Sequence, residues 1–204
     1  MKASKLQSEL VNWTVRNSGF EARRPYIGLS HMGECDRLIY DQYVYGFERP
    51  KVAGHLQTRW SYEVEQIIIA RLTEMKLFTP MEEISLFDGL VKGHPDGGVC
   101  GSLLEIKSVQ REDHFPKEGR IPRRVFWQVQ AYLRYTGIRW CDVIYVARDT
   151  GILQVYEIKE QPNVGDEIDC RLADLVKAVQ TMTRPACSCG RCLEASPDGH
   201  KSSE

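Results

Sequence analysis

The sequence predicts an α/β domain, with a central mixed β-sheet flanked by helices. The first observation is a change in the spacing of apolar residues: it is helical up to about residue 76 and alternating from residue 82. The second is the order of elements that follows, which is three short strands, a helix and two more strands. The third is size. A chain of 204 residues that is 42% hydrophobic and 27% charged can bury one core without disulfide bonds.

Local signals give the expected elements their limits. Asp88-Gly89 and Gly97-Gly98 are expected turns, Gly137 closes one helix, and residues 148–151 join two strands as a hairpin. Ser30 resembles an N-cap, which would place Cys35 in the second turn of the helix that follows. Helices are thus expected over 5–17, 31–44, 58–76, 124–136 and 164–182, and strands over 82–88, 90–96, 102–109, 141–147 and 152–158.

The helix expected over 58–76 carries its apolar residues on one face, as a core helix does. The residues on that face are Trp60, Val64, Ile67, Ile68, Leu72 and Met75. We therefore expect all six side chains to face the sheet.

Charge and hydropathy exclude a membrane protein and leave nucleic acid open as a partner. The net charge is −1 and the isoelectric point is near 6.5, yet a local basic groove is enough to bind DNA. No run of eighteen apolar residues occurs, and the first twenty residues lack an apolar signal core. These features predict a cytoplasmic protein that does not bind membranes.

Three of the seven cysteines fall within six residues, in the run CSCGRC formed by Cys187, Cys189 and Cys192. In a reducing compartment, thiols this close are more often metal or cluster ligands than disulfides. Zinc and iron–sulfur clusters both require four ligands. Cys35 is the first candidate for the fourth and Cys170 the second, whereas Cys100 and Cys141 fit buried apolar positions.

The strongest chemical signal is Pro95-Asp96 followed by Glu105-Ile106-Lys107 on the next expected strand. Side chains alternate along a strand, so Glu105 and Lys107 share one face and Ile106 points to the other. Two carboxylates converging beside a lysine suit Mg²⁺ or Mn²⁺ and the hydrolysis of a phosphodiester. The alternative is an ordinary cross-strand ion pair. A second copy, Glu157-Ile158-Lys159, lacks the Pro-Asp partner and is expected to be a solvated strand face.

The next helix offers polar groups that fit this site. Gln128 and Tyr132 are four residues apart on one face, with Arg124 one turn earlier. In isolation, Tyr132 would be interpreted as a half-buried core residue with Gln128 as its polar neighbour. The loop before the helix is basic and carries aromatic residues nearby, which suits the backbone and bases of a single DNA strand. The candidate DNA-binding residues are Arg120, Arg123, Arg124 and Trp127.

Together these motifs resemble the PD-(D/E)xK nucleases of the RecB-like clan. More narrowly, they resemble the CRISPR-associated exonuclease family numbered four in the Cas series, which includes phage-encoded relatives. The resemblance runs from about Cys35 to Cys192 and implies a restriction-endonuclease-like core with Mg²⁺- or Mn²⁺-dependent cleavage of DNA ends. It also implies a structural [4Fe–4S] cluster held by Cys35, Cys187, Cys189 and Cys192.

The resemblance implies a role for each motif residue. Asp96, Glu105 and the backbone carbonyl of Ile106 would hold the metal, Lys107 would assist the attacking water, and Gln128 and Tyr132 would position DNA. The expected organisation is an N-terminal helical region at 1–57, a nuclease core at 58–182, the cysteine run at 183–195 and a disordered tail at 196–204.

Two departures from the family pattern leave alternatives open. The family places a histidine where this chain has Tyr62, so either Glu63 or Glu65 is expected to supply a third carboxylate, and the spacing Ser61-x-x-x-Glu65 favours Glu65. The late cysteines are also closer together than is usual, which leaves zinc as a second choice for the metal.

The function expected from the sequence is a metal-dependent exonuclease acting on single-stranded or frayed DNA ends. It would work in CRISPR spacer acquisition beside an integrase, or in phage DNA processing with a recombination partner. The alternative is a catalytically weak iron–sulfur subunit that binds DNA ends within an integration or recombination complex.

Overall fold

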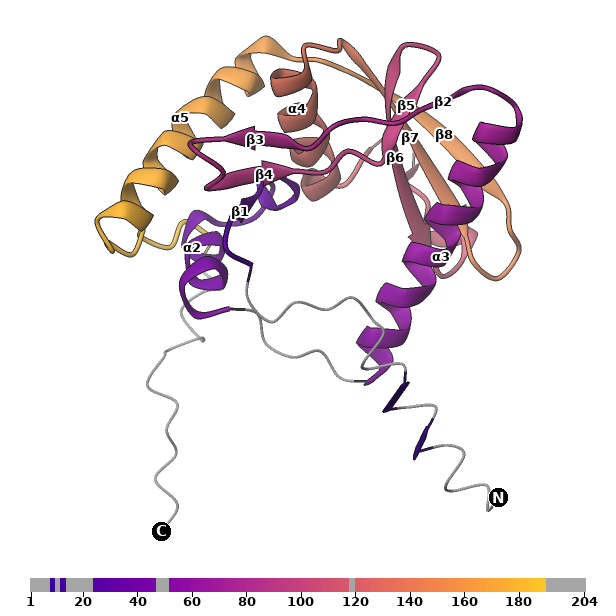
Figure 1. Ribbon diagram of the computed structural model, residues 1–204, viewed down its shortest axis with the longest axis horizontal. Coiled ribbons are helices and arrows are strands. Elements are labelled where there is room, and N and C mark those ends of the chain that lie inside the picture. Colours follow the sequence, from indigo (N-terminus) through magenta and orange to yellow (C-terminus); the bar gives the residue numbers. More distant parts are fainter. Residues whose placement is uncertain (1–7, 10–11, 14–23, 47–51, 118–119, 190–204) are drawn as a thin grey trace.

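The computed structural model describes residues 8–9, 12–13, 24–46, 52–117 and 120–189 (Figure 1). Two β-sheets organise these residues. The small sheet has the order β1-β4-β3, formed by Ile27–Gly28, Val91–Gly93 and Ile84–Leu86. The large sheet has the order β2-β5-β6-β7-β8, formed by Phe78–Thr79, Gly97–Val99, Ser102–Val109, Trp140–Ala147 and Leu153–Lys159.

Helices cover both faces of the large sheet, as Figure 1 shows. Helix α3 (Val52–Glu74) lies on one face, and α4 (Arg123–Thr136) and α5 (Pro162–Gln180) lie on the other. Helix α2 (Asp36–Tyr45) packs against α5. The short 3₁₀ helices η1 (Leu29–His31) and η2 (Glu112–His114) complete the set. Because β6 and β7 are parallel and the other neighbours in the large sheet are antiparallel, the sheet is mixed and the predicted fold class is confirmed.

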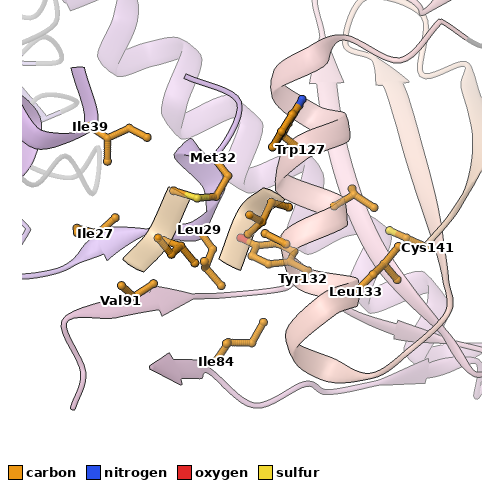
Figure 2. Close-up of a cluster of buried hydrophobic side chains, with 14 of the residues drawn as sticks. Ile27, Leu29, Met32, Ile39, Ile84, Val91, Trp127, Tyr132, Leu133 and Cys141 are labelled. Atoms are coloured by element: carbon orange, nitrogen blue, oxygen red, sulfur yellow. The ribbon is translucent and has the colours of Figure 1, made fainter. Parts of the chain in front are cut away.

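Two apolar cores hold the helices against the two faces of the large sheet. The larger joins α4, α5, η1, β1 and the small sheet to one face of the large sheet; part of it is drawn in Figure 2, where Leu29, Met32 and Tyr132 lie together. The smaller core lies under α3 and is formed by Leu104, Ile106, Ile144 and Val146 of β6 and β7. The strand β6 therefore contributes to both cores, and the alternation of its side chains places Glu105 and Lys107 opposite Ile106.

Asp96 lies where the chain passes from the small sheet to the large one, and two glycines make that passage possible. A Cβ atom on Gly93 would lie 2.7 Å from Leu29 Cδ1 and 2.9 Å from Tyr132 Cε1. Gly97 has φ +156°, and a Cβ atom there would collide with the ring of Phe78. Close packing on both sides thus fixes the position of Asp96.

Most expected elements are present, including the β7–β8 hairpin and the end of α4 at Gly137, which has left-handed φ +72°. The Gly97-Gly98 turn is wrong: Gly97–Val99 is a strand paired with β6, and the turn falls at Cys100 and Gly101. Cys100 is consequently exposed rather than buried. Of the helix expected over 5–17, only residues 8–9 and 12–13 are described, and these are helical.

The helix expected over 31–44 begins later, because Cys35 is the N-cap of α2 with an extended backbone. Arg171 of α5 binds the carbonyl oxygens of Met32 (2.7 Å) and Glu34 (2.9 Å), which would otherwise accept helical hydrogen bonds. A long-range contact therefore displaces the start of the helix.

The predicted inner face of α3 is only partly correct. Val64, Ile68 and Leu72 pack on the sheet, but Trp60 and Ile67 are 50% and 58% exposed. Met75 is exposed as well. The apolar stripe of the helix is wider than the part that the sheet covers.

Candidate active site and cysteine centre

The structure brings the two halves of the predicted metal motif together in one cleft of about 630 Å³. Asp96, Glu105, Lys107, Gln128 and Tyr132 all line it. The first three come from the β4–β5 connection and β6, and the last two come from α4. Strand pairing sets this arrangement, because Gly97 is opposite Leu104 and Asp96 therefore lies beside Glu105.

Glu105 is the most buried charged group in this cleft, with 2% of its surface exposed. Its Oε1 atom accepts hydrogen bonds from Lys107 Nζ and from Gln128 Nε2, the latter at 2.8 Å. Its Oε2 atom is buried and has no hydrogen-bond partner. Burial raises the pKa of Glu105 to about 7, and the nearby charges of Asp96 and Glu65 act in the same direction.

Asp96 is held by the backbone of the neighbouring strand. Its Oδ2 atom accepts a hydrogen bond of 2.6 Å from the amide N–H of Ile106. Burial raises the pKa of Asp96, although this hydrogen bond and the charge of Lys107 oppose the shift. The side chain of Ile106 packs in the core under α3, so only its backbone is available to the cleft.

The third carboxylate of the cleft is Glu65 rather than Glu63. Glu65 and Ser61, one turn apart on α3, both line the cleft. Burial, and then the charge of Asp96, raise the pKa of Glu65 to about 7. Glu63 forms an ion pair of 2.8 Å with Arg59, and Tyr62 is half exposed and does not line the cleft.

A hydrogen-bonded row joins β6 to α4. Lys107 Nζ donates to Gln128 Oε1 at 3.1 Å, and Gln128 Nε2 lies 3.3 Å from the hydroxyl oxygen of Tyr132. Tyr132 is 3% exposed and packs in the large core (Figure 2). It also lines the cleft, so it is both a core residue and part of the site. Gln128 orients the lysine and the buried glutamate at the same time.

The candidate DNA-binding residues at and just before the start of α4 lie differently from what the sequence suggested. Trp127 is 9% exposed and contacts the guanidinium groups of Arg123 and Arg171, at 5.5 and 5.0 Å from its ring centre. Its ring is therefore not available to stack on an unpaired base. Arg124 forms an ion pair of 3.2 Å with Glu34 and does not line the cleft. Arg120 does not line the cleft either.

Residues that the sequence did not predict to belong to the site complete the wall of the cleft. They are Arg24, Tyr26, Ser30, His94 and Ser108. The rings of Tyr26 and His94 lie 5.9 Å apart, and His94 Nε2 is 2.7 Å from Glu83 Oε2. Three of these residues precede α2 and reach the cleft because β1 pairs in parallel with β4, a contact that no local sequence signal reports.

Three of the four predicted cluster cysteines lie together. The Sγ atoms of Cys35, Cys187 and Cys189 are all within 4.8 Å of one another. Cys187 and Cys189 are 3.6 Å apart, and Cys35 Sγ lies 3.7 Å from Ser188 Oγ. Cys192 lies outside the described residues, and Cys170 is exposed on α5, outside the group. Three converging thiols can hold a metal ion.

Two arginine clamps fix the segments that carry these thiols. Arg184 Nε donates to Asp41 Oδ1 at 2.7 Å, which attaches the chain after α5 to α2. Arg171 Nε donates to Asp36 Oδ1 at 3.2 Å, next to Cys35. These bonds bring together cysteines more than 150 residues apart in the sequence.

Comparison with solved structures identifies the fold. LHK-Exo, an alkaline exonuclease from Laribacter hongkongensis solved in complex with dAMP, aligns with TM-score 0.56 and 20% identity over 85% of this chain and 96% of its own. SSO0001 aligns with TM-score 0.57 and 16% identity over 94% and 96%. A phage-related exonuclease from Haemophilus somnus 129PT aligns with TM-score 0.54 and 13% identity over 76% and 80%. The chain shares the fold of these proteins.

No family model matches the sequence, and no curated protein matches it either. Among the described helices, none combines the length and the apolar character needed to cross a membrane.

Proposed function

We propose that this protein is a divalent-metal-dependent deoxyribonuclease that digests single-stranded or frayed DNA ends. The observation that carries the proposal is the buried and unpartnered Oε2 atom of Glu105, in a cleft that also holds Asp96 and Glu65. A buried carboxylate oxygen without a partner is costly unless a cation binds it. Three carboxylates at one cleft are a hard oxygen donor set, which suits Mg²⁺ or Mn²⁺.

In this proposal Asp96, Glu105 and the carbonyl oxygen of Ile106 hold the cation, and Glu65 completes the set. The bound ion would supply Lewis-acid activation of water and neutralise charge on the scissile phosphate. Glu105 and Gln128 hold Lys107 beside these carboxylates. Its ammonium group would assist the attacking water and stabilise the negative charge that develops during hydrolysis. Gln128 also keeps that lysine in position, and Gln128 and Tyr132 would position the DNA.

The choice of DNA ends as substrate is supported by the names of the similar structures, two of which are exonucleases. We further propose a [4Fe–4S] cluster on Cys35, Cys187, Cys189 and Cys192, with zinc as the second choice. Its role would be structural, because hydrolysis requires no electron transfer. The proposed settings are CRISPR spacer acquisition with an integrase, and phage DNA processing with a recombination partner.

The experiment is a Mn²⁺-dependent digestion of end-labelled single-stranded DNA by the wild type and by the Lys107→Ala variant. We expect digestion to fall at least about 100-fold in the variant, because a positioned electrostatic group is lost, while DNA binding is retained. The matched control is Lys159→Ala in the second Glu-x-Lys copy, where Lys159 is exposed and stacks on Trp140 at 5.0 Å. This control should digest DNA like the wild type.

Two results would contradict the proposal. Digestion that survives Lys107→Ala would refute the assignment of the site. Tight DNA binding without digestion by the wild type would favour the alternative, a subunit that binds DNA ends within a larger complex.

A further inference from the structure

A second hollow, here called the α3 groove, is lined by a different set of α3 residues from the cleft. Its volume is about 520 Å³, and its lining includes Trp60, Val64 and Ile67 from α3 with Gln110, Arg148 and Asp149 from the far ends of β6 and β7. Half of the Trp60 surface is exposed here. A large aromatic ring left open to solvent in a groove indicates a binding surface.

A row of hydrogen bonds connects residues of the α3 groove with residues of the cleft. Ser61 and Ser108 line the cleft, and their hydroxyl oxygens are 2.8 Å apart. Arg148 Nη1, in the groove, donates to Ser108 Oγ at 3.0 Å. Ser108 is the residue after Lys107, the proposed catalytic lysine. Arg148 of the groove is therefore joined by one hydrogen bond to the neighbour of that lysine.

The groove is rigidly built. The pairing of β6 with β7 continues past both strands, since Arg148 N–H donates to the carbonyl oxygen of Val109 at 2.9 Å and Asp149 N–H to that of Gln110 at 3.3 Å. The guanidinium group of Arg148 makes no ion pair with any residue that the structure describes. A cation held in place without a carboxylate partner is ready for an anionic ligand.

The balance of charges indicates how that ligand is recognised. Two carboxylates also line the groove, but Glu63 is already paired with Arg59, so Arg148 faces Asp149 alone. A nearly neutral groove with an open indole ring suits stacking of a base, supported by one phosphate contact. The Arg148 guanidinium has no carboxylate partner among the described residues and is one hydrogen bond from Ser108 of the proposed cleavage site, which favours an occupant that carries phosphates.

We infer that the α3 groove binds the nucleotides of a single DNA strand next to the scissile phosphate, with a base stacked on Trp60 and a phosphate at Arg148. This inference rests on the proposed function and adds a strand-binding site to it.

The test is binding of a fluorescein-labelled oligothymidylate in Ca²⁺, which allows binding to be measured apart from Mn²⁺-dependent digestion. The probes carry one abasic residue at successive positions. Loss of a stacked base costs about 5- to 150-fold in affinity. We expect this loss in Trp60→Ala, and a smaller one in Trp60→Phe, which keeps an aromatic face. An abasic residue at one position should weaken binding to the wild type by a similar factor and have no further effect in Trp60→Ala.

Arg148→Gln should lower affinity and reduce the salt dependence of binding by roughly the contribution of one phosphate, a slope change of about 0.7. The matched control is Trp140→Ala, since Trp140 is an exposed tryptophan outside the groove. It should bind like the wild type. The abasic scan on wild-type protein, with Trp60→Phe, keeps the test valid if Trp60→Ala folds poorly.

The outcomes distinguish failure of the strand-binding site from failure of the proposed nuclease function. Wild type that binds the strand, with unchanged affinity in both groove variants and no sensitive abasic position, would overturn this inference alone and leave the proposed function standing. Wild type that neither binds nor digests single-stranded DNA would overturn the proposed function and this inference together.

Discussion

Replacing Glu105 with glutamine should stabilise the metal-free protein at alkaline pH while removing its response to Mn²⁺. The carboxyl of Glu105 is buried beside two other carboxylates, and its pKa is raised from the ordinary 4.5 to about 7. The folded state therefore binds this proton more tightly than the unfolded state does. Stability from this group is fully present below pH 4.5 and is lost as the pH rises towards 7.

The size of the effect follows from the same values. A pKa difference of this size corresponds to about 3 kcal/mol between the two protonation states. Glutamine keeps the hydrogen-bond acceptor for Gln128 but places a polar amide where Oε2 has no partner, which costs about 1–2 kcal/mol. The expected net gain at pH 8 is about 1–2 kcal/mol, or roughly 3–6 °C in melting temperature for a chain of this length.

The assay is thermal unfolding in a chelator at pH 5 and pH 8, repeated with Mn²⁺ at pH 8. We expect Glu105→Gln to melt higher than the wild type only at pH 8, and Mn²⁺ to stabilise the wild type alone. Glu157→Gln, on the exposed face of β8, is the control and should change neither result. A variant that melts lower than the wild type at pH 8, or is stabilised by Mn²⁺ to the same extent, would refute the view of Glu105 as a strained cation ligand.

Two further predictions concern the cysteine centre. Gly33→Ala should lower the free energy of unfolding by about 1–3 kcal/mol, because a Cβ atom would lie 2.5 Å from Arg124 Cα; denaturant melts would check it, with Gly98→Ala as the control, since ordinary contacts of 3.4 Å surround that position. An equal effect at both glycines would contradict the close approach. Asp41→Asn should weaken metal binding by the late thiols by roughly tenfold, because it loosens the Arg184 clamp; competition with a chelator, followed by elemental analysis, would measure this. Unchanged metal affinity would mean that the clamp does not position the thiols.

The sequence alone predicted those parts of the site that depend on spacing along one strand or one helix. Strand alternation placed Glu105 and Lys107 on one face, and helical spacing placed Gln128 above Tyr132. The contacts that decide the rest are long-range. The start of α2 depends on Arg171, more than 130 residues away, and the burial of Trp127 depends on guanidinium groups from two helices. Neither contact leaves a periodic pattern in the sequence.

The wall formed by Arg24, Tyr26 and Ser30 could not be predicted from the sequence, because it too depends on a long-range contact. Its residues reach the cleft through a two-residue parallel strand, β1, which is too short to give a periodic signal. Glu65, in contrast, could be preferred over Glu63 because it shares a helix face with Ser61. Helical spacing could therefore select Glu65 over Glu63 as the site carboxylate of α3. The wall formed by Arg24, Tyr26 and Ser30 could be identified only from the tertiary structure.

The cysteine centre and the cleft are linked through the first turn of α4. The loop that leads to Cys35 packs Gly33 against the backbone of Arg124, and Glu34 binds the Arg124 side chain at 3.2 Å. Gln128, which orients Lys107, is one turn further along the same helix. A displacement of the Cys35 loop would therefore act on the helix that positions Lys107, the proposed catalytic lysine. The cysteine centre need not exchange electrons to affect the proposed hydrolysis, because its position alone bears on the geometry of the cleft.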